Sequence, residues 1–197
     1  MKSLRHFIVK VEKRFNDTIN IGDKEFYLDP KFNEFEHRIA YGEIVSPPLN
    51  FDTGAKIGDT LFFHHHVIMA APLSIGNGMY ICEYDEKNPH TPDHAIAYRS
   101  KESKKLKMLN DWVFVEPVFG DGGDVKTDSG IIVEVSKEKV RANVARVMVT
   151  NKDIEWMGVK PGDIVGFDKN SDYKIKLDDG TIAYRMRADD LSYVEEQ

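Results

Sequence analysis

Three consecutive histidines, His64-His65-His66, are the residues of this chain best suited to bind a metal ion. Imidazole nitrogen is a common ligand of zinc and other transition metals, and His90 and His94 are further candidates. The apolar run before the histidines predicts a strand, and consecutive residues of a strand face opposite sides of the sheet. Only His64 and His66 could then meet one ion, and the ligand spacing of a structural zinc site is absent. We therefore expect no metal site here.

Residue patterns for covalent or phosphate chemistry are missing from the sequence. The single cysteine, Cys82, has no cysteine partner for a disulfide or a metal site, and no serine stands in a nucleophile-elbow motif. The glycine-rich segment 120–130 lacks the Gly-Lys-Ser or Gly-Lys-Thr ending of a phosphate-binding loop, and its carboxylates lack the spacing of a calcium loop. The sequence therefore gives no support for an enzyme or for a bound cofactor.

The composition is that of an ordinary soluble protein, with 41% hydrophobic and 30% charged residues. No stretch approaches the roughly 18 apolar residues of a membrane span. The first residues also lack the apolar core of a signal peptide, so we expect a cytoplasmic protein with no membrane role. The net charge of −6, with neither half basic, argues against binding to nucleic acid.

An internal repeat is the strongest pattern in the sequence. The segment 56–63, in which a Lys-Ile-Gly-Asp turn leads into an apolar run, returns as 160–167 with Lys-Pro-Gly-Asp. The opening segment 7–11 corresponds to the apolar segment 112–116 in the second copy. Because the copies are about a hundred residues apart, they predict two duplicated domains, each with its own core, rather than the short units of a solenoid.

The tetrapeptide Ile-Ala-Tyr-Arg follows the turn in both copies, at 96–99 and at 182–185, and we interpret it as the closing strand of each copy. This interpretation predicts domains at 1–105 and 106–197. It also gives the first copy the longer path from turn to closing strand. We therefore expect a divergent first domain with an insertion at about 71–92, and a second domain without it.

The elements that position these segments are predicted to be short strands, because β-branched and alternating residues are separated by Gly, Pro, Asn and Asp clusters. The predicted strands are 7–11, 42–45, 60–63, 79–83 and 95–98 in the first copy, and 112–115, 144–149, 164–167, 173–177 and 181–185 in the second. Helix is predicted only at 136–144 and for one turn at 153–157. Each copy is thus expected to be a small, mostly antiparallel β-barrel.

Four pieces of the second copy follow one another in a fixed order. They are the opening segment 109–115, a glycine-rich loop, the turn at 160–165 and the closing segment 187–194. In this order they resemble the GroES co-chaperonins, and the first copy is similar through its opening strand, its turn and its closing strand. The resemblance implies an all-β fold of two GroES-like small β-barrels in tandem.

The resemblance also implies a function and partners. Co-chaperonins of this family form rings that cap the cavity of a GroEL-type chaperonin and assist ATP-dependent protein folding. They are not enzymes and carry no cofactor, since the partner binds and hydrolyses the ATP. We therefore expect a homo-oligomeric ring with a chaperonin as its partner. The alternative is a GroES-like structural or assembly module, for example a viral one, that no longer binds a chaperonin.

Members of this family grip the chaperonin through a mobile loop in which a hydrophobic tripeptide follows glycine. Gly130, Ile131, Ile132 and Val133 take this place in the second copy, within a loop that runs from 119 to about 143. Glycines and charged residues fill the rest of the loop and cannot bury enough apolar area to order it alone. The alternative is that residues 131–133 form an edge strand packed on their own barrel.

The corresponding loop of the first copy, residues 14–37, departs from this pattern. Its most apolar tripeptide is Phe26-Tyr27-Leu28, which glycine does not precede. Several further aromatic residues in this loop suggest that it folds against something. Phe26, Tyr27 and Leu28 are therefore a possible second anchor for the chaperonin, and whether this copy binds stays open.

Overall fold

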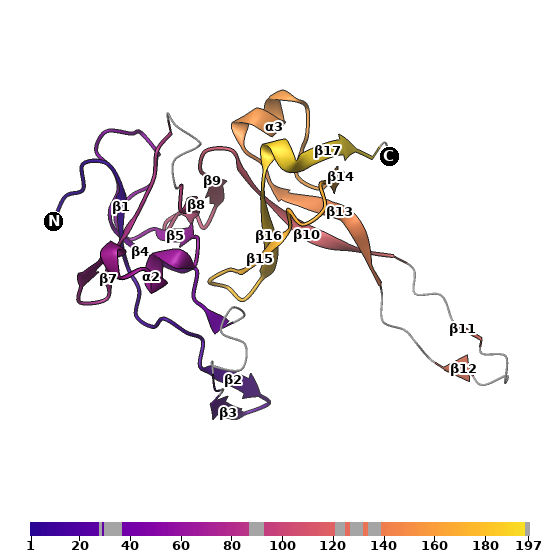
Figure 1. Cartoon of the computed structure of the whole chain (residues 1–197), viewed down its shortest axis with the longest axis horizontal. Coiled ribbons are helices and arrows are strands. Elements are labelled where there is room, and N and C mark those ends of the chain that lie inside the picture. The colour runs from indigo at the N-terminus through magenta and orange to yellow at the C-terminus, as the bar shows by residue number, and fades with distance from the viewer. Residues whose placement is uncertain are drawn as a thin grey trace. The chain divides into compact units, whose positions relative to one another are not determined.

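The computed structural model describes residues 1–27, 29, 37–86, 93–120, 125–126, 132–133 and 139–195, and its fold is all-β (Figure 1). The chain divides into two compact units. The first consists of Met1–Trp112 with Ile175–Ile182, and the second of Val113–Lys174 with Ala183–Gln197. A short piece of the second copy's sequence is therefore counted with the first unit.

The large sheet of the first unit has seven strands in the order β6-β7-β1-β4-β5-β8-β9. Their bounds are β1 Phe7–Lys10, β4 Tyr41–Ser46, β5 Thr60–Phe63, β6 Ser74–Gly76, β7 Met79–Cys82, β8 Ala95–Arg99 and β9 Leu106–Met108. Neighbouring strands pair antiparallel. Helix α2, His66–Met69, and a 3-10 turn, Ala71–Leu73, follow β5.

The core of the first unit lies on one face of this sheet. Phe7 and Val9 alternate along β1 and are fully buried together with Ile44, Leu61 and Phe63. Side chains two positions apart on a strand share a face, so the alternation places these residues in one cluster. Burying each of them stabilises the unit by roughly 1.5–3 kcal/mol.

The large sheet of the second unit has six strands in the order β15-β16-β10-β13-β14-β17. Their bounds are β10 Trp112–Gly120, β13 Lys139–Val149, β14 Ile164–Phe167, β15 Tyr173–Lys176, β16 Ile182–Arg187 and β17 Leu191–Val194, with helix α3 at Lys152–Trp156 and a 3-10 turn at Ala188–Asp190. Val113 and Val115 of β10 share a buried core with Val147, Ile154 and Val165.

The two sheets repeat one strand order. The first sheet contains the neighbouring strands β7-β1-β4-β5-β8, and the second contains β16-β10-β13-β14-β17. Each strand of the first series corresponds to the strand at the same position of the second series, because both series follow the same order along their copy of the sequence. A further edge strand, β6 or β15, lies beyond the first of these in each sheet. The duplication inferred from the sequence is therefore present in the fold as two β-barrel-like units.

The Gly-Asp turns of the two copies are built alike. The carboxylate of Asp59 accepts a hydrogen bond from the backbone N–H of Lys56, and that of Asp163 accepts one from Lys160, each at 2.8 Å. The glycine before each aspartate has a positive φ, 87° and 97° respectively, which favours glycine at this position. The repeated sequence thus encodes a repeated turn.

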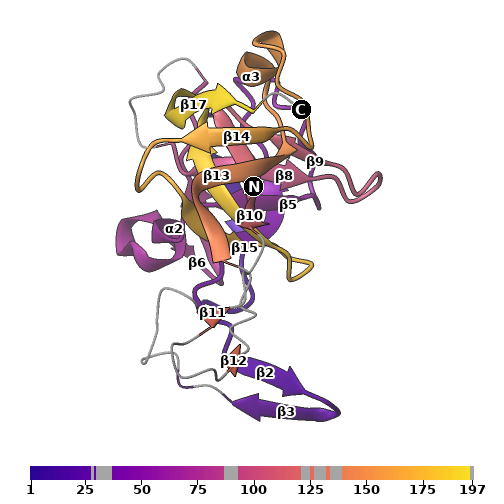
Figure 2. The same ribbon diagram turned by 90° about the vertical axis from the view of Figure 1, so that its right-hand side faces the viewer.

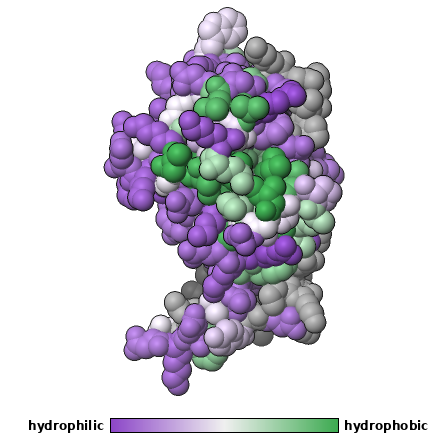
Figure 3. All heavy atoms as spheres, turned by 90° about the vertical axis from the view of Figure 1, so that its left-hand side faces the viewer, coloured by the Kyte–Doolittle hydropathy of each residue, from purple (hydrophilic) through white to green (hydrophobic). Residues whose placement is uncertain are grey.

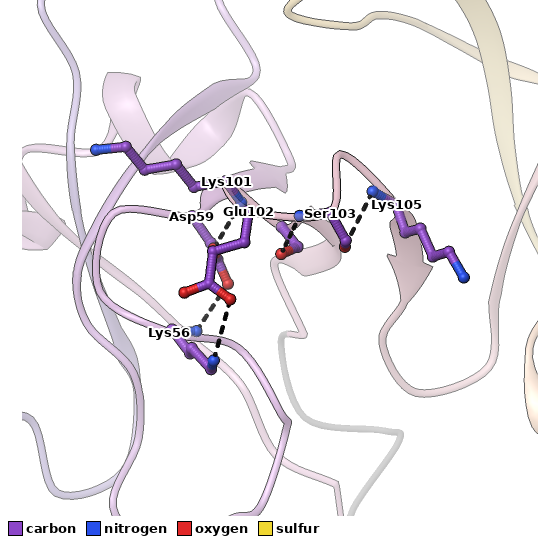
Figure 4. A network of polar contacts seen from close by, with 7 residues as sticks. Lys56, Asp59, Lys101, Glu102, Ser103 and Lys105 are labelled. Atoms are coloured by element: carbon purple, nitrogen blue, oxygen red, sulfur yellow. Dashed lines mark hydrogen bonds and ion pairs between the residues drawn. The ribbon is translucent and has the colours of Figure 1, made fainter.

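The first turn has an additional partner. Asp59, which is 4% exposed, also accepts a hydrogen bond of 2.8 Å from the backbone N–H of Lys101 (Figure 4). Lys101 belongs to the turn between β8 and β9, whose backbone N–H groups are held by Ser100 and Ser103. The lysine-rich segment between the copies is therefore tied to the sheet of the first unit through Asp59.

The shared tetrapeptide does not mark equivalent strands. In the first copy Ile-Ala-Tyr-Arg lies in β8, which pairs with β5, whereas in the second copy it lies in β16, which neighbours β10. By strand order the counterpart of β16 is β7, and the counterpart of β8 is β17. The interpretation of both tetrapeptides as closing strands is therefore wrong for the second copy. Strands β6 and β7, within residues 71–92, take the places of β15 and β16. The first copy has the longer connection both from β5 to β6, which contains α2, and from β7 to β8.

The helix predicted at 136–144 is wrong over its described part, because Lys139–Val149 forms the long strand β13. Pairing with β10 brings Ala145 opposite Pro117 and Arg146 opposite Glu116. The β-branched valines of this segment fit a strand better than a helix. The turn predicted at 153–157 is confirmed as α3, and no described helix is long and apolar enough to cross a membrane.

Replacing Asn151 by alanine should lower the free energy of unfolding by about 1 kcal/mol. Asn151 is the N-cap of α3, and its side-chain oxygen accepts a hydrogen bond of 2.9 Å from the backbone N–H of Ile154. Urea unfolding followed by circular dichroism measures the loss. Asn151→Asp keeps the acceptor and should retain most of the stability, so equal losses in the two variants would contradict the capping role.

Candidate functional site

Each unit carries a small hairpin between the first two central strands of its sheet. In the first unit β2, Thr18–Ile21, and β3, Lys24–Tyr27, lie between β1 and β4 in the chain. In the second, β11, Val125–Lys126, and β12, Ile132–Val133, lie between β10 and β13. Each hairpin is a separate two-stranded sheet, and in both views it lies away from the large sheet of its own unit (Figures 1 and 2).

The hairpin of the second unit contains part of the tripeptide expected to bind a chaperonin. Ile132 pairs with Lys126 and Val133 with Val125. Neither strand belongs to the six-stranded sheet, so β12 is not an edge strand of that sheet, contrary to the alternative derived from the sequence. Gly130 and Ile131 lie outside the described residues. The backbone therefore places Ile132 and Val133 at a distance from the barrel.

The base of this loop is an extension of the large sheet. Strands β10 and β13 stay paired to the end, with Phe119 opposite Val140 and Gly120 opposite Lys139. The side chains of Phe119 and Val140 are 52% and 53% exposed, since the core of the unit does not reach this far. The paired strands thus form a stalk that carries the loop.

An ion pair joins the stalk to the end of the chain. The guanidinium of Arg141, on β13, donates two hydrogen bonds to the carboxylate of Glu195, which follows β17. The hydrogen bond from Arg141 lowers the pKa of Glu195 below its ordinary value. Both side chains are accessible to water, so the pair contributes little to stability.

The hairpin of the first unit exposes aromatic side chains. Phe26 and Tyr27, at the end of β3, are 46% and 83% exposed, and they pair with Ile19 and Thr18 of β2. A backbone hydrogen bond of 2.7 Å from Asn16 to the carbonyl of residue 37 closes the base of this loop. Leu28, the third residue of the possible anchor, lies outside the described residues. The described part of the anchor is therefore accessible.

A further exposed aromatic residue lies between β13 and β14. Trp156, in the last position of α3, is 88% exposed, and Met157 beside it is 60% exposed. Ile154 is 1% exposed and is the residue of α3 that packs into the core. Ile154 and Trp156 are two positions apart and therefore lie on nearly opposite sides of the helix, so burial of one predicts exposure of the other.

The three histidines lie in a turn rather than in a strand. Strand β5 ends at Phe63 and α2 begins at His66, so the alternation of a strand does not apply. One ligand atom of each ring lies within 4.8 Å of those of the other two. The prediction that only His64 and His66 could meet one ion is therefore wrong. His90 lies outside the described residues.

The single cysteine is not placed for chemistry. Cys82, in β7, is fully buried in the core of the first unit. Burial raises the pKa of its thiol well above the ordinary value, which disfavours the reactive thiolate. Cys82 therefore acts as a small apolar core residue, as its sequence context predicts.

Comparison with known proteins adds one positive finding. No curated protein matches this chain. A family model matches the second copy over the opening strand, the stalk, the loop and the Gly-Asp turn. Residues 105–193 match the family described as "Chaperonin 10 Kd subunit", which supports a GroES-type domain in the second half of the chain.

Proposed function

We propose that this protein is a co-chaperonin that caps a GroEL-type chaperonin ring and assists ATP-dependent folding of enclosed proteins. The observation that carries the proposal is the position of β12 within the family match. Ile132 and Val133 lie on a hairpin that is separate from the six-stranded sheet and within the matched residues 105–193. By the resemblance to the GroES co-chaperonins, this loop carries the chaperonin-binding tripeptide. Gly130 and Ile131 complete the binding segment.

The physical chemistry of this segment suits reversible capping. An apolar side chain that moves from water into an apolar groove contributes roughly 2 kcal/mol. Ordering the loop offsets part of this gain, so that a single loop binds weakly. Several loops on one ring multiply the affinity through their effective concentration. A ring of weak loops holds the chaperonin firmly and still releases it.

The first unit contributes a second GroES-type barrel in this proposal. Its support is the strand order that it shares with the second unit and the Gly-Asp turn with the same hydrogen bond. The β2–β3 hairpin occupies the same place in the chain as β11–β12. Phe26, Tyr27 and Leu28 would then form a second, weaker anchor, because glycine does not precede them and their hairpin is already paired.

The proposal includes assembly into a closed ring of identical chains. Strand β17 is an edge strand of the second sheet and offers a row of backbone groups to a neighbouring chain. The first unit exposes apolar side chains among polar ones on the face shown in Figure 3. Leu4 and Leu49, 70% and 61% exposed, belong to neighbouring backbone segments joined by a hydrogen bond from Asn50 to Leu4. Such residues would be covered by contact between chains.

Retention of a chaperonin ring on the immobilised protein tests this function. We expect retention in the presence of ATP or ADP and a change in the chaperonin's ATPase rate, because in this proposal the partner binds and hydrolyses the ATP. Retention should fail without nucleotide. If the chain forms a ring by native mass spectrometry and yet retains no chaperonin under either condition, the co-chaperonin function is contradicted in favour of a structural assembly module.

A further inference from the structure

The turn between β5 and α2 gathers three imidazole rings in one place. The centroids of the His64 and His65 rings are 4.3 Å apart, those of His64 and His66 are 4.5 Å apart, and those of His65 and His66 are 4.7 Å apart. The rings are inclined to one another by 20° to 41°. Consecutive side chains therefore point to one side of the chain, which neither a strand nor a regular helix would achieve.

The backbone of this turn is fixed on both sides. The N–H of His64 donates to the carbonyl of His94 at 2.8 Å, and the carbonyl of His64 accepts from Val67 at 3.0 Å. Phe63 before the turn and Val67 after it are fully buried. The backbone of the turn is therefore already ordered before a ligand binds, so that binding costs little further conformational entropy of the backbone. This is a requirement for a preorganised ligand set.

We propose that His64, His65 and His66 together bind one divalent transition-metal ion of the zinc class. Their ligand atoms lie within 4.8 Å of one another, and nitrogen ligands of a tetrahedral zinc ion are about 3.3 Å apart. Binding therefore requires the rings to rotate about their side-chain bonds until the three nitrogens are this close. Imidazole nitrogens suit zinc, nickel, copper and cobalt, whereas calcium and magnesium require oxygen ligands.

One existing hydrogen bond bears on the geometry of binding. The backbone N–H of His66 donates to Nδ1 of His64 at 3.2 Å. If the metal binds through Nδ1, it replaces this hydrogen bond. If it binds through Nε2, the ring must take the tautomer with the proton on Nδ1, and the hydrogen bond is lost as well. Either route exchanges one hydrogen bond for a metal–nitrogen bond.

The surroundings leave the ion accessible and add negative charge. His64 and His65 are half-buried and His66 is exposed, so that water can complete the coordination shell. Nδ1 of His94 lies 3.3 Å from the carboxylate of Glu83, and the ring of His94 lies 6.2 Å from that of His64. Glu83 thus adds a carboxylate beside His94, the neighbour of the turn, and a negative charge nearby favours a dication through Coulomb attraction.

Calorimetric titration of the full chain with zinc chloride tests the proposal. The protein carries no histidine tag and is first treated with a chelator that is then removed. We expect one zinc ion per chain with micromolar affinity, and a loss of at least tenfold in affinity for each of His64→Gln, His65→Gln and His66→Gln. His37→Gln is the matched control because it removes a histidine elsewhere in the same unit, and it should bind as the unchanged chain does.

A second measurement separates loss of ligands from loss of fold. Each variant should keep the circular dichroism spectrum and melting temperature of the metal-free protein, while the rise in melting temperature at a fixed zinc concentration should be smaller in each variant than in the unchanged chain. Cobalt(II) should give the visible absorption bands of a four-coordinate site. The proposal is overturned if zinc does not bind saturably, if the three variants lose no more affinity than His37→Gln, or if His94→Gln loses more affinity than they do. Because zinc alone is the probe, none of these outcomes depends on chaperonin binding.

Discussion

The variant Ile132→Asp should no longer be retained by a chaperonin ring in the presence of nucleotide. A buried apolar side chain contributes about 2 kcal/mol per loop, which corresponds to roughly 30-fold in the affinity of a single loop. A carboxylate at the same position would also have to be desolvated in an apolar groove. Because every loop of a ring carries the change, the combined affinity falls by much more than the affinity of one loop.

Val140→Asp is the matched control for this variant. It introduces the same charge at an exposed valine of the stalk, 53% exposed, outside the proposed binding segment. This control should still be retained, and Tyr27→Asp should reduce retention less than Ile132→Asp does. Full retention of Ile132→Asp would contradict the assignment of the loop. Equal loss in Val140→Asp would show that charge on the loop, rather than the apolar contact, decides binding.

Asp59→Ala should lower the free energy of unfolding by about 3 kcal/mol. Asp59 is 4% exposed and accepts hydrogen bonds from the backbone N–H groups of Lys56 and Lys101, both at 2.8 Å. Hydrogen bonds to a charged acceptor contribute about 1.5–3 kcal/mol each, and their loss leaves two donors without a partner. Urea unfolding monitored by circular dichroism measures the change.

The duplicated turn offers a matched control inside the same chain. Asp163→Ala removes the same residue from the same turn, but Asp163 is half-exposed, and its carboxylate accepts a hydrogen bond from the backbone N–H of Lys160. We expect a loss of about 1 kcal/mol there, because water replaces the partner. If the two variants lose equal stability, the contact with Lys101 contributes nothing, and the segment between the copies is not anchored through Asp59.

Local patterns in the sequence predicted most of the central strands. Thr60–Phe63 and Ile164–Phe167 were predicted with the bounds that the structure has, because a Gly-Asp turn fixes where each strand begins. The predicted strands 173–177 and 181–185 flank an Asp-Asp-Gly turn, where the backbone N–H of Leu177 donates to the carbonyl of Thr181 at 2.9 Å. Turn chemistry is local, so a single sequence can reveal it.

The pairing of strands could not be predicted from the sequence in the same way. An identical tetrapeptide lies in β8 and in β16, yet one strand pairs with β5 and the other neighbours β10. The partner of a strand depends on contacts distant in the chain, which four residues do not encode. Ile132, Phe26 and Tyr27 lie on hairpins separate from the large sheets, and their role in binding stays a prediction. The histidine turn could not be predicted, because strand β5 ends one residue before it.

Pairing between β8 and β9 decides where the chain can be divided without damage. A cut at residue 105, midway between the repeated sequences, would remove β9 from the edge of β8, and with it the buried side chains of Leu109 and Trp112. The freed edge of β8 would be a template for aggregation. Expression of the first half alone thus requires an end point beyond Trp112. Even that piece would lack residues 175–182, which belong to the first unit. In this segment Asp178 and Asp179 form ion pairs with Arg99 at 3.2 and 2.8 Å. The boundary between the repeated sequences is consequently not a boundary between separable pieces of structure.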